Sequence, residues 1–100
     1  MAVKGEVENL DERLLNAVFR ALAEPSRRRV LELIHQHPGI TVQELVEHLP
    51  VSRFAIMKHL NVLEASWLVR RERDGLVKRL YVDPGPLERL PPWVARFKRR

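Results

Sequence analysis

The fold is decided by residues 41–66, which read TVQELVEHLPVSRFAIMKHLNVLEAS. Thr41 and Glu44 have the spacing of a capping box, in which each side chain accepts a hydrogen bond from the other residue's backbone N–H at the start of a helix. Pro50 ends that helix, and Ser52 is placed to cap a second one that runs to the end of the stretch. The stretch therefore predicts two consecutive helices joined by a tight turn.

The second of these helices has two unlike faces. Its inner face is an apolar stripe at helical spacing, made of Ile56, Leu60 and Leu63. Its outer face is largely basic and polar and carries Arg53, Phe54, Met57, Lys58 and Asn61. Tandem helices of this kind, the second one basic on its outer face, are typical of helix-turn-helix proteins, which insert the second helix into the major groove of DNA.

Three residues of this helix have two interpretations each. Phe54 and Met57 lie off the apolar stripe, so either they pack at the edge of the core or they contact thymine methyl groups. His59 lies on the inner side, where packing and hydrogen bonding are the expected roles and base reading is the alternative. Ser52, at the helix start, is expected to contact a phosphate, because helix N-termini favour anions.

Two further helices precede this pair. Apolar residues recur at helical spacing over residues 9–22, which predicts the first helix. Pro25 suits the first turn of the second helix, because its missing N–H would have no partner there in any case. Pro38-Gly39 ends that second helix.

The residue pattern changes from helical to β after the fourth helix. Two β-type runs, 67–73 and 76–82, flank Asp74-Gly75, a dipeptide that favours a two-residue hairpin turn. Basic residues near the tip suit a wing that contacts the DNA backbone or minor groove. The wing residues assigned to DNA are Arg73, Lys78 and Arg79, with Arg71 as a further candidate.

The C-terminal segment 87–98 is apolar at helical spacing, but Pro91-Pro92 interrupts it, so two pieces are expected, the firmer one starting near Pro92. This segment and the helix at 9–22 carry more apolar surface than a small core requires, which favours a homodimer. The residues assigned to the dimer interface are Leu10, Leu14, Val18, Leu87, Leu90, Trp93, Val94 and Phe97. Trp93 is the expected anchor. The alternative is that the last segment folds back onto its own domain.

The complete order is helix, helix, helix, helix, hairpin, helix: a mainly α fold with a small β-hairpin wing, in a single domain over residues 1–100. No apolar run approaches the length of a membrane span, and the N-terminal residues lack a signal peptide's apolar stretch. We therefore expect a cytoplasmic protein with no membrane partner.

The charge distribution suits a polyanionic partner. The net charge is +5, and residues 25–100 hold fifteen basic and eight acidic side chains. A basic body of this kind fits DNA, RNA or an acidic membrane surface, but a merely solvated basic surface explains the composition equally well. The charge therefore supports the helix-turn-helix pattern without deciding it.

Enzymatic chemistry has no support in the sequence. There is no Gly-x-Ser-x-Gly, no phosphate-binding glycine loop, no cysteine and no pair of histidines at ligand spacing. We expect neither catalysis nor a cofactor. The competing binding functions are a protein-interaction module and a nonspecific DNA- or RNA-binding protein on the same fold.

Three motifs resemble the ArsR family of winged-helix repressors and together cover about residues 17–83. They are FRALAEPSRRRVLELI, TVQELVEHLPVSRFAIMKHLNVLE and LVRRERDGLVKRLYV. VSRFAIMKHL and the ending PGPLERLPPWVARF are similar to a cysteine-free subgroup. The resemblance implies a winged helix-turn-helix fold, binding to a palindromic operator in double-stranded DNA, and a homodimer that pairs through terminal helices. The effector is not indicated.

Two departures from the family pattern stand out. The family usually has glycine where this chain has Trp67, so a distorted exit from the fourth helix is expected. Metal sensors of the family carry a cysteine pair in the helix matching residues 41–49, or acidic and histidine ligands in the last helix, where this chain has only Glu88. No metal is expected, and His35, His37 and His48 are interpreted as surface histidines.

Overall fold

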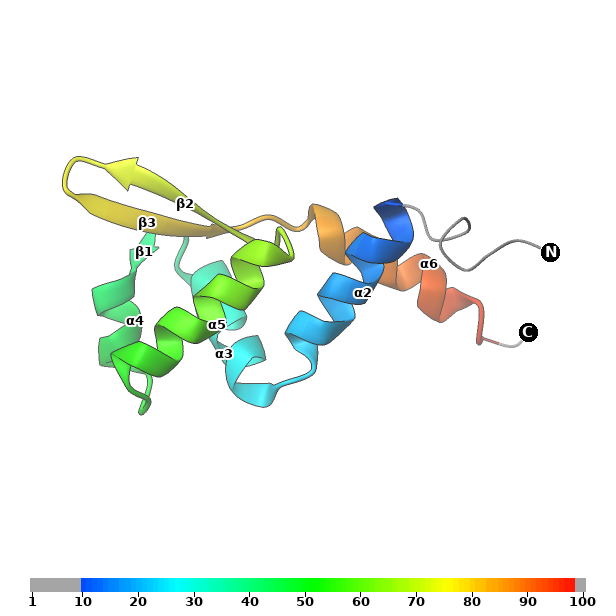
Figure 1. Ribbon diagram of the computed structural model, residues 1–100, viewed down its shortest axis with the longest axis horizontal. Coiled ribbons are helices and arrows are strands. Elements are labelled where there is room, and N and C mark those ends of the chain that lie inside the picture. The colour runs from blue at the N-terminus through cyan, green and yellow to red at the C-terminus, as the bar shows by residue number, and fades with distance from the viewer. Residues whose placement is uncertain (1–9, 99–100) are drawn as a thin grey trace.

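The computed structural model describes residues 10–98 and has the expected helices and hairpin, with one additional strand (Figure 1). The helices of the N-terminal part are α2 (Leu10–Leu22), α3 (Pro25–Gln36), α4 (Val42–His48) and α5 (Arg53–Ala65). The strands are β1 (Ile40–Thr41), β2 (Val69–Asp74) and β3 (Val77–Val82), and the chain continues with the 3-10 helix η1 (Gly85–Arg89) and α6 (Leu90–Ala95). The predicted fold class is confirmed.

The sequence analysis missed β1. Ile40 pairs with Leu80 and Thr41 with Arg79, so the sheet has three antiparallel strands in the order β1-β3-β2 rather than a hairpin alone. Two residues are too few to show a strand period. Ile40 and Thr41 are β-branched, but the breaker Pro38-Gly39 before them indicated only the end of a helix.

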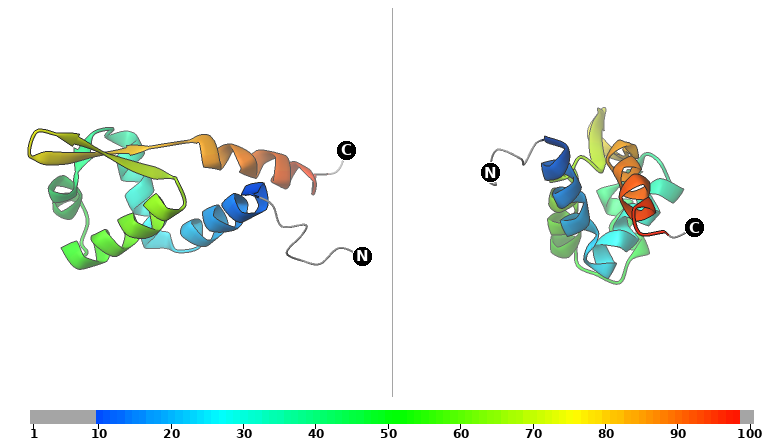
Figure 2. Two further views of the ribbon diagram at one scale, coloured as in Figure 1. Left: turned by 45° about the horizontal axis from the view of Figure 1, so that its top comes forward. Right: turned by 90° about the vertical axis from the view of Figure 1, so that its right-hand side faces the viewer.

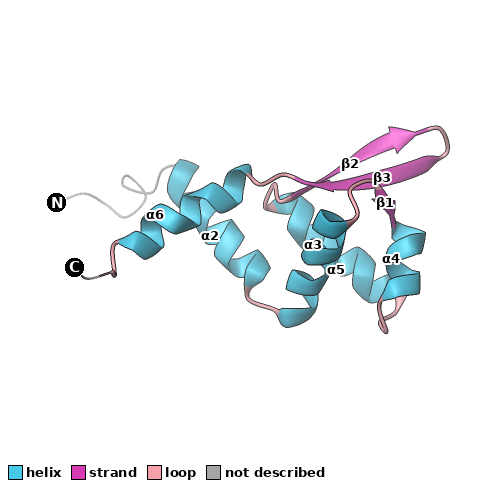
Figure 3. Ribbon diagram, turned by 180° about the vertical axis from the view of Figure 1, so that it is seen from behind, coloured by secondary structure: helices cyan, strands magenta, loops and turns pink. Residues whose placement is uncertain are grey.

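The core lies where α3, α4 and α5 meet one face of the sheet. The inner stripe of α5 is fully buried, as its spacing predicts, and Leu45 of α4 and Leu80 of β3 are buried with it. The β2–β3 hairpin extends from this core at the end of the molecule opposite the chain termini (Figure 3). The hairpin therefore projects beyond the core, and its strand β2 contacts α5.

Side-chain caps fix the starts of α4 and α5. The Thr41 hydroxyl accepts from the Glu44 backbone N–H at 3.2 Å, and the Glu44 carboxylate accepts from the Thr41 N–H at 2.9 Å, which confirms the capping box. The Ser52 hydroxyl accepts from the Ala55 N–H at 3.1 Å. Each cap satisfies N–H groups that a helix start leaves without partners.

The exit from α5 is regular, so the expectation of a distorted exit is wrong. Trp67 has φ 65°, the left-handed conformation that glycine favours. Its N–H donates to Glu64 O and the Leu68 N–H donates to Leu63 O, each at 3.0 Å, which is the hydrogen-bond pair of a Schellman motif. Leu63 and Leu68 are fully buried and hold this geometry, although a left-handed residue with a Cβ costs about 1–2 kcal/mol.

The two terminal segments pack against each other at the far end of the molecule (Figure 2). The Phe19 and Trp93 rings meet edge-on with centroids 5.1 Å apart, and Arg89 pairs with Asp11 at 3.0 Å. The last segment is in two pieces, as expected, but α6 begins at Leu90 and contains Pro91-Pro92 in its first turn. Proline is tolerated there because the N–H it lacks has no helical partner at that position.

Candidate nucleic-acid interface

The outer surface of α5 presents Arg53, Phe54, Lys58 and Asn61 to solvent, whereas Ile56, Leu60 and Leu63 are buried. Phe54 is 73% exposed, which excludes a core role for it in the chain by itself. Met57 differs, because its side chain is half-buried and packs against the core cluster. The structure therefore separates the two apolar residues that the sequence could not distinguish.

Two contacts order this face. The Lys58 ammonium lies 5.5 Å from the centre of the Phe54 ring, within the range of a cation–π interaction. Arg53 donates to the side-chain oxygen of Gln43 on α4 at 3.0 Å. Sequence reasoning missed Gln43. Its outward position in the first turn of α4 was the available signal.

Ser52 keeps a donor available at the start of α5. Its oxygen accepts the capping bond from Ala55, so its own O–H remains able to donate to an incoming oxygen. The helix start also concentrates partial positive charge. Ser52 is thus placed to bind a phosphate oxygen without losing its capping role.

The wing residues fall into two groups. Arg73 and Lys78 are cross-strand neighbours next to the Asp74-Gly75 turn, and both are exposed. Arg79 instead donates to Asp74 at 2.7 Å and to the Gly39 carbonyl at 3.0 Å. The Asp74 hydrogen bond is the main cause that raises the pKa of Arg79.

Two further arginines of the hairpin are paired. Arg70 donates to Glu72 at 2.8 Å, and its guanidinium lies 4.9 Å from the centre of the Tyr81 ring. Arg71 pairs with Glu64 of α5. The positive charge of the wing that is not paired within residues 10–98 therefore comes from Arg73 and Lys78 at its tip.

A groove of about 340 Å³ runs between α5, the start of α4 and the wing. Its charged lining consists of Arg53, Arg71 and Lys78, and no acidic side chain of the described chain lines it. Gln43 and Thr41 add polar atoms, and Leu76 at the hairpin turn is fully exposed at its rim. The groove has the charge and the polar donors that suit a nucleic-acid backbone.

Two histidines come together away from this face. The His37 and His48 rings, which the sequence analysis interpreted as surface histidines, have centroids 5.9 Å apart. Residues 10–98 contain no cluster of three or more His, Asp or Glu that could hold a metal ion. None of the described helices is long and apolar enough to cross a membrane.

The residues assigned to the dimer interface do not all lie at the surface. Leu10, Val94 and Phe97 are 77%, 44% and 67% exposed. The half-buried ones are Leu14, Leu87, Leu90 and Trp93. The assignment of Val18 is corrected, because its side chain is fully buried within the chain itself and has no surface to offer a partner.

The structure combines capped tandem helices, a basic outer face on the second helix and a cationic hairpin beside that helix. These features define a winged helix-turn-helix regulator that binds DNA. Comparison with known proteins agrees: the sequence model of the MarR family matches residues 24–80. The chain belongs to this family, and the curated relatives that it resembles are named as transcription regulators.

Three relatives illustrate the match. The transcriptional repressor SdpR of Bacillus subtilis is 33% identical over 83% of this chain and 91% of its own length. The solved structure of an ArsR-like transcriptional regulator from Rhodococcus sp. RHA1 has a TM-score of 0.76 at 32% identity, over 84% of this chain and 78% of that one. The ArsR family regulator RHA00566 has a TM-score of 0.72 at 31% identity, over 96% and 91%.

Proposed function

We propose that the protein is a repressor of the ArsR type that binds a palindromic operator as a homodimer. The observation that carries the proposal is the placement of exposed polar and basic groups of α5 beside the cation-lined groove of the wing. The names of the relatives, a transcriptional repressor and ArsR-type regulators, support the same function.

In this proposal α5 reads bases. Arg53, Lys58 and Asn61 reach base edges in the major groove, and Phe54 meets a thymine methyl while it orients Lys58. Ser52 donates to a phosphate. Met57 is half-buried, so its share in DNA contact is limited to its exposed edge.

The wing contributes contacts that do not depend on sequence. Arg73 and Lys78 contact the DNA backbone or the minor groove. Arg79 acts indirectly: because two of its donors are engaged by Asp74 and Gly39, it holds the wing against the start of β1. This revises the direct contact expected for Arg79 from the sequence.

The homodimer pairs through α2 and α6. The exposed apolar side chains Leu10, Val94 and Phe97 would otherwise face water, and a two-fold protein matches a two-fold operator. Trp93, half-buried between Phe19 and Phe97, supports this surface from within the protomer. A response to metals is not part of the proposal.

Selection from a pool of random duplexes tests the proposal. The wild-type protein is expected to enrich a palindrome with half-sites about one helical turn apart. Arg53→Ala and Lys58→Ala should each weaken binding to the enriched duplex by about 1–3 kcal/mol. Arg20→Ala is the control, because Arg20 is an exposed arginine of α2 that does not line the groove.

Three outcomes would contradict the proposal. Enrichment of no sequence, with salt-dependent retention on any duplex, would indicate a nonspecific binder. No retention on DNA at all would indicate a protein-interaction module. If both α5 variants bind the enriched duplex as tightly as the wild type and unfold at the same temperature, α5 does not read bases.

A further inference from the structure

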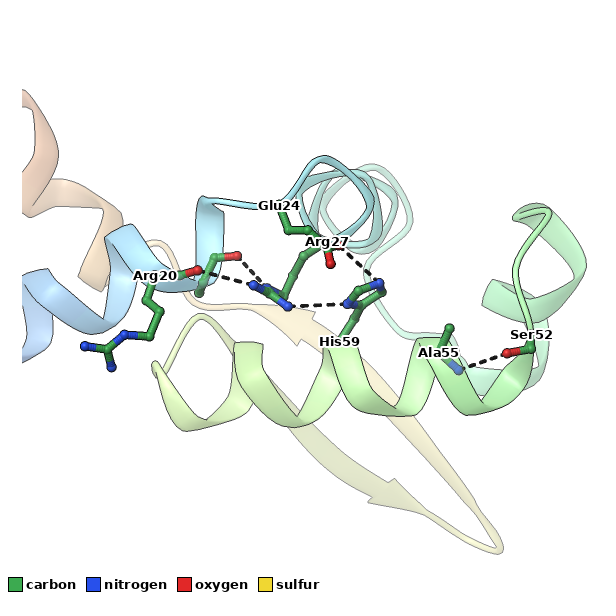
Figure 4. Close-up of polar contacts among 7 residues, drawn as sticks. Arg20, Glu24, Arg27, Ser52, Ala55 and His59 are labelled. Atoms are coloured by element: carbon green, nitrogen blue, oxygen red, sulfur yellow. Dashed lines mark hydrogen bonds and ion pairs between the residues drawn. The ribbon is translucent and has the colours of Figure 1, made fainter.

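A polar junction connects the recognition helix α5 to the two helices before the helix-turn-helix (Figure 4). Its centre is His59, whose side chain is 12% exposed and faces α3. The ring Nδ1 lies 3.5 Å from an Arg27 terminal nitrogen, and Nε2 lies 3.4 Å from a Glu24 carboxylate oxygen. The junction thus joins residues 32 positions apart in the sequence.

Arg27 extends the junction to the terminal helix α2. Its Nε donates to the Ala21 carbonyl at 2.6 Å, and a second terminal nitrogen donates to the Arg20 carbonyl at 3.2 Å. The last carbonyls of a helix have no helical partner and carry partial negative charge, so a guanidinium is a favourable cap there. One side chain therefore holds the end of α2 and touches α5.

The chemistry of the guanidinium fixes the direction of the hydrogen bond between Arg27 and His59. A guanidinium only donates, so Nδ1 of His59 must accept from Arg27. The ring proton then lies on Nε2, which faces the Glu24 carboxylate oxygen at 3.4 Å. A chain of donors and acceptors runs from the α2 carbonyls through Arg27 and His59 to Glu24.

His59 is adjacent to the DNA-reading face. It directly follows Lys58, so it lies about 100° around α5 from that residue. A rotation of α5 that broke the Arg27 contact would turn Lys58 and Asn61 by the same angle. In a dimer that pairs through α2, such a rotation would also change the separation of the two recognition helices.

We propose that Arg27 and His59 are positioning residues that fix the orientation of α5 relative to α2, and thereby the half-site spacing that the dimer accepts. This inference rests on the proposed function. Neither Arg27 nor His59 touches DNA in this proposal. They act through the angle between the helix that pairs the protomers and the helix that reads bases.

Arg28 supplies a matched control. It lies beside Arg27 in the first turn of α3 and also donates to an α2 carbonyl, that of Leu22, at 2.5 Å. Among residues 10–98, Arg28 makes no hydrogen bond or ion pair with α5. If Arg27 served only to cap α2, then Arg27→Met and Arg28→Met would have the same consequences.

The test compares four variants on duplexes in which the enriched half-sites are moved apart by zero, one or two base pairs. His59→Leu and Arg27→Met should lose the spacing preference and bind the best duplex at least tenfold more weakly, while single half-site affinity stays within threefold. His59→Gln, which can still accept and donate, should restore most of the preference. Arg28→Met should keep it.

A spacing preference in His59→Leu and Arg27→Met equal to that of the wild type would overturn the inference. If His59→Leu and Arg27→Met unfold, NMR spectra of His59→Gln and of the wild type still test the inference. In the wild-type ring Nε2 should carry a proton and Nδ1 should not, and His59→Gln should leave the Lys58 and Asn61 amide resonances close to their wild-type positions. A ring protonated at Nδ1 would overturn the inference.

The selection and spacing measurements together separate the inference from the proposed function. A wild-type protein that enriches no palindrome fails the proposed function, and the spacing role fails with it. A palindrome enriched by the wild type with a spacing preference unaffected by His59→Leu fails the positioning role alone.

Discussion

Two regions of the molecule cover their apolar side chains to different extents. One is the body, residues 24–83, and the other is the terminal pair, formed by α2 with η1 and α6. In the body, the residues that face inward are fully covered, as with Leu60 and Leu80. In the terminal pair, Phe19 and Trp93 cover one another in part, while Phe97 remains 67% exposed. The body is complete as one chain, and the terminal pair presents apolar surface that a second copy can cover.

The two regions also differ in how their polar groups are used. Caps and ion pairs in the body fix the placement of α4, α5 and the wing, whereas Arg89 and Asp11 form a partly exposed pair that joins the terminal segments. Only the Arg27 junction joins α2 to the recognition helix by side-chain hydrogen bonds among the described residues. In the proposed function, the body reads DNA and the terminal pair joins the protomers, and the Arg27 junction is the polar link between these two regions.

The largest expected effect is on assembly. Phe97→Glu places a charge in the proposed interface, so we expect it to raise the dimer dissociation constant by an amount equivalent to about 2 kcal/mol or more. Sedimentation velocity across micromolar concentrations measures the shift. Leu76→Glu is the control, because Leu76 is fully exposed on the wing. If Phe97→Glu and the wild type sediment with the same molecular mass at every concentration, α6 is not part of the interface.

The next effect concerns the wing and should be the same on every duplex. Arg73→Gln and Lys78→Gln should each reduce the slope of log affinity against log salt by about one, because each removes one phosphate contact. Arg70→Gln, on the same hairpin but paired with Glu72, should leave the slope unchanged. A slope equal to the wild type in both tip variants would show that the tip does not touch DNA.

A smaller effect is expected on stability within the body. Trp67→Gly should raise the free energy of unfolding by about 1 kcal/mol, because glycine adopts the observed left-handed conformation without strain. Chemical denaturation measures it. Trp67→Ala keeps the Cβ and should bring no gain. A destabilised glycine variant would mean that indole contacts outweigh the backbone strain.

The smallest effect is pH-dependent. The hydrogen bond from the Thr41 N–H is the largest cause that lowers the pKa of Glu44, so the ionised carboxylate stabilises the folded state. That contribution is present above the ordinary glutamate pKa of about 4.3 and is lost as the pH falls through the lower folded value. Wild type should therefore unfold at a slightly higher temperature than Glu44→Gln at pH 7, and the difference should vanish at low pH. A difference that is constant with pH would contradict this.

Much of the fold could be predicted because its signals are local. Thr41 and Ser52 cap their helices through residues three positions away, and the stripe of Ile56, Leu60 and Leu63 repeats within one helix. Trp67 shows the limit of such rules. The residue type argued against a left-handed exit, yet the burial of Leu63 and Leu68 imposes one.

The candidate site was predicted as a face, but its internal contacts were not. Two of these contacts join separate helices, one between Gln43 and Arg53 and the other between Arg27 and His59. No rule of sequence spacing predicts either contact. Val18 was misassigned for a similar reason. An apolar helical position shows that something covers the side chain, and only the tertiary fold shows that its own chain does so.

The most direct measurement compares binding of the wild type and of Phe97→Glu to the enriched palindrome and to a duplex with one half-site. The account predicts that the wild type binds the palindrome as two protomers and far more tightly than the half-site, while Phe97→Glu binds both duplexes with the same half-site affinity. Tight binding of two Phe97→Glu protomers to the palindrome, equal to the wild type, would contradict the assignment of reading to the body and pairing to the terminal helices.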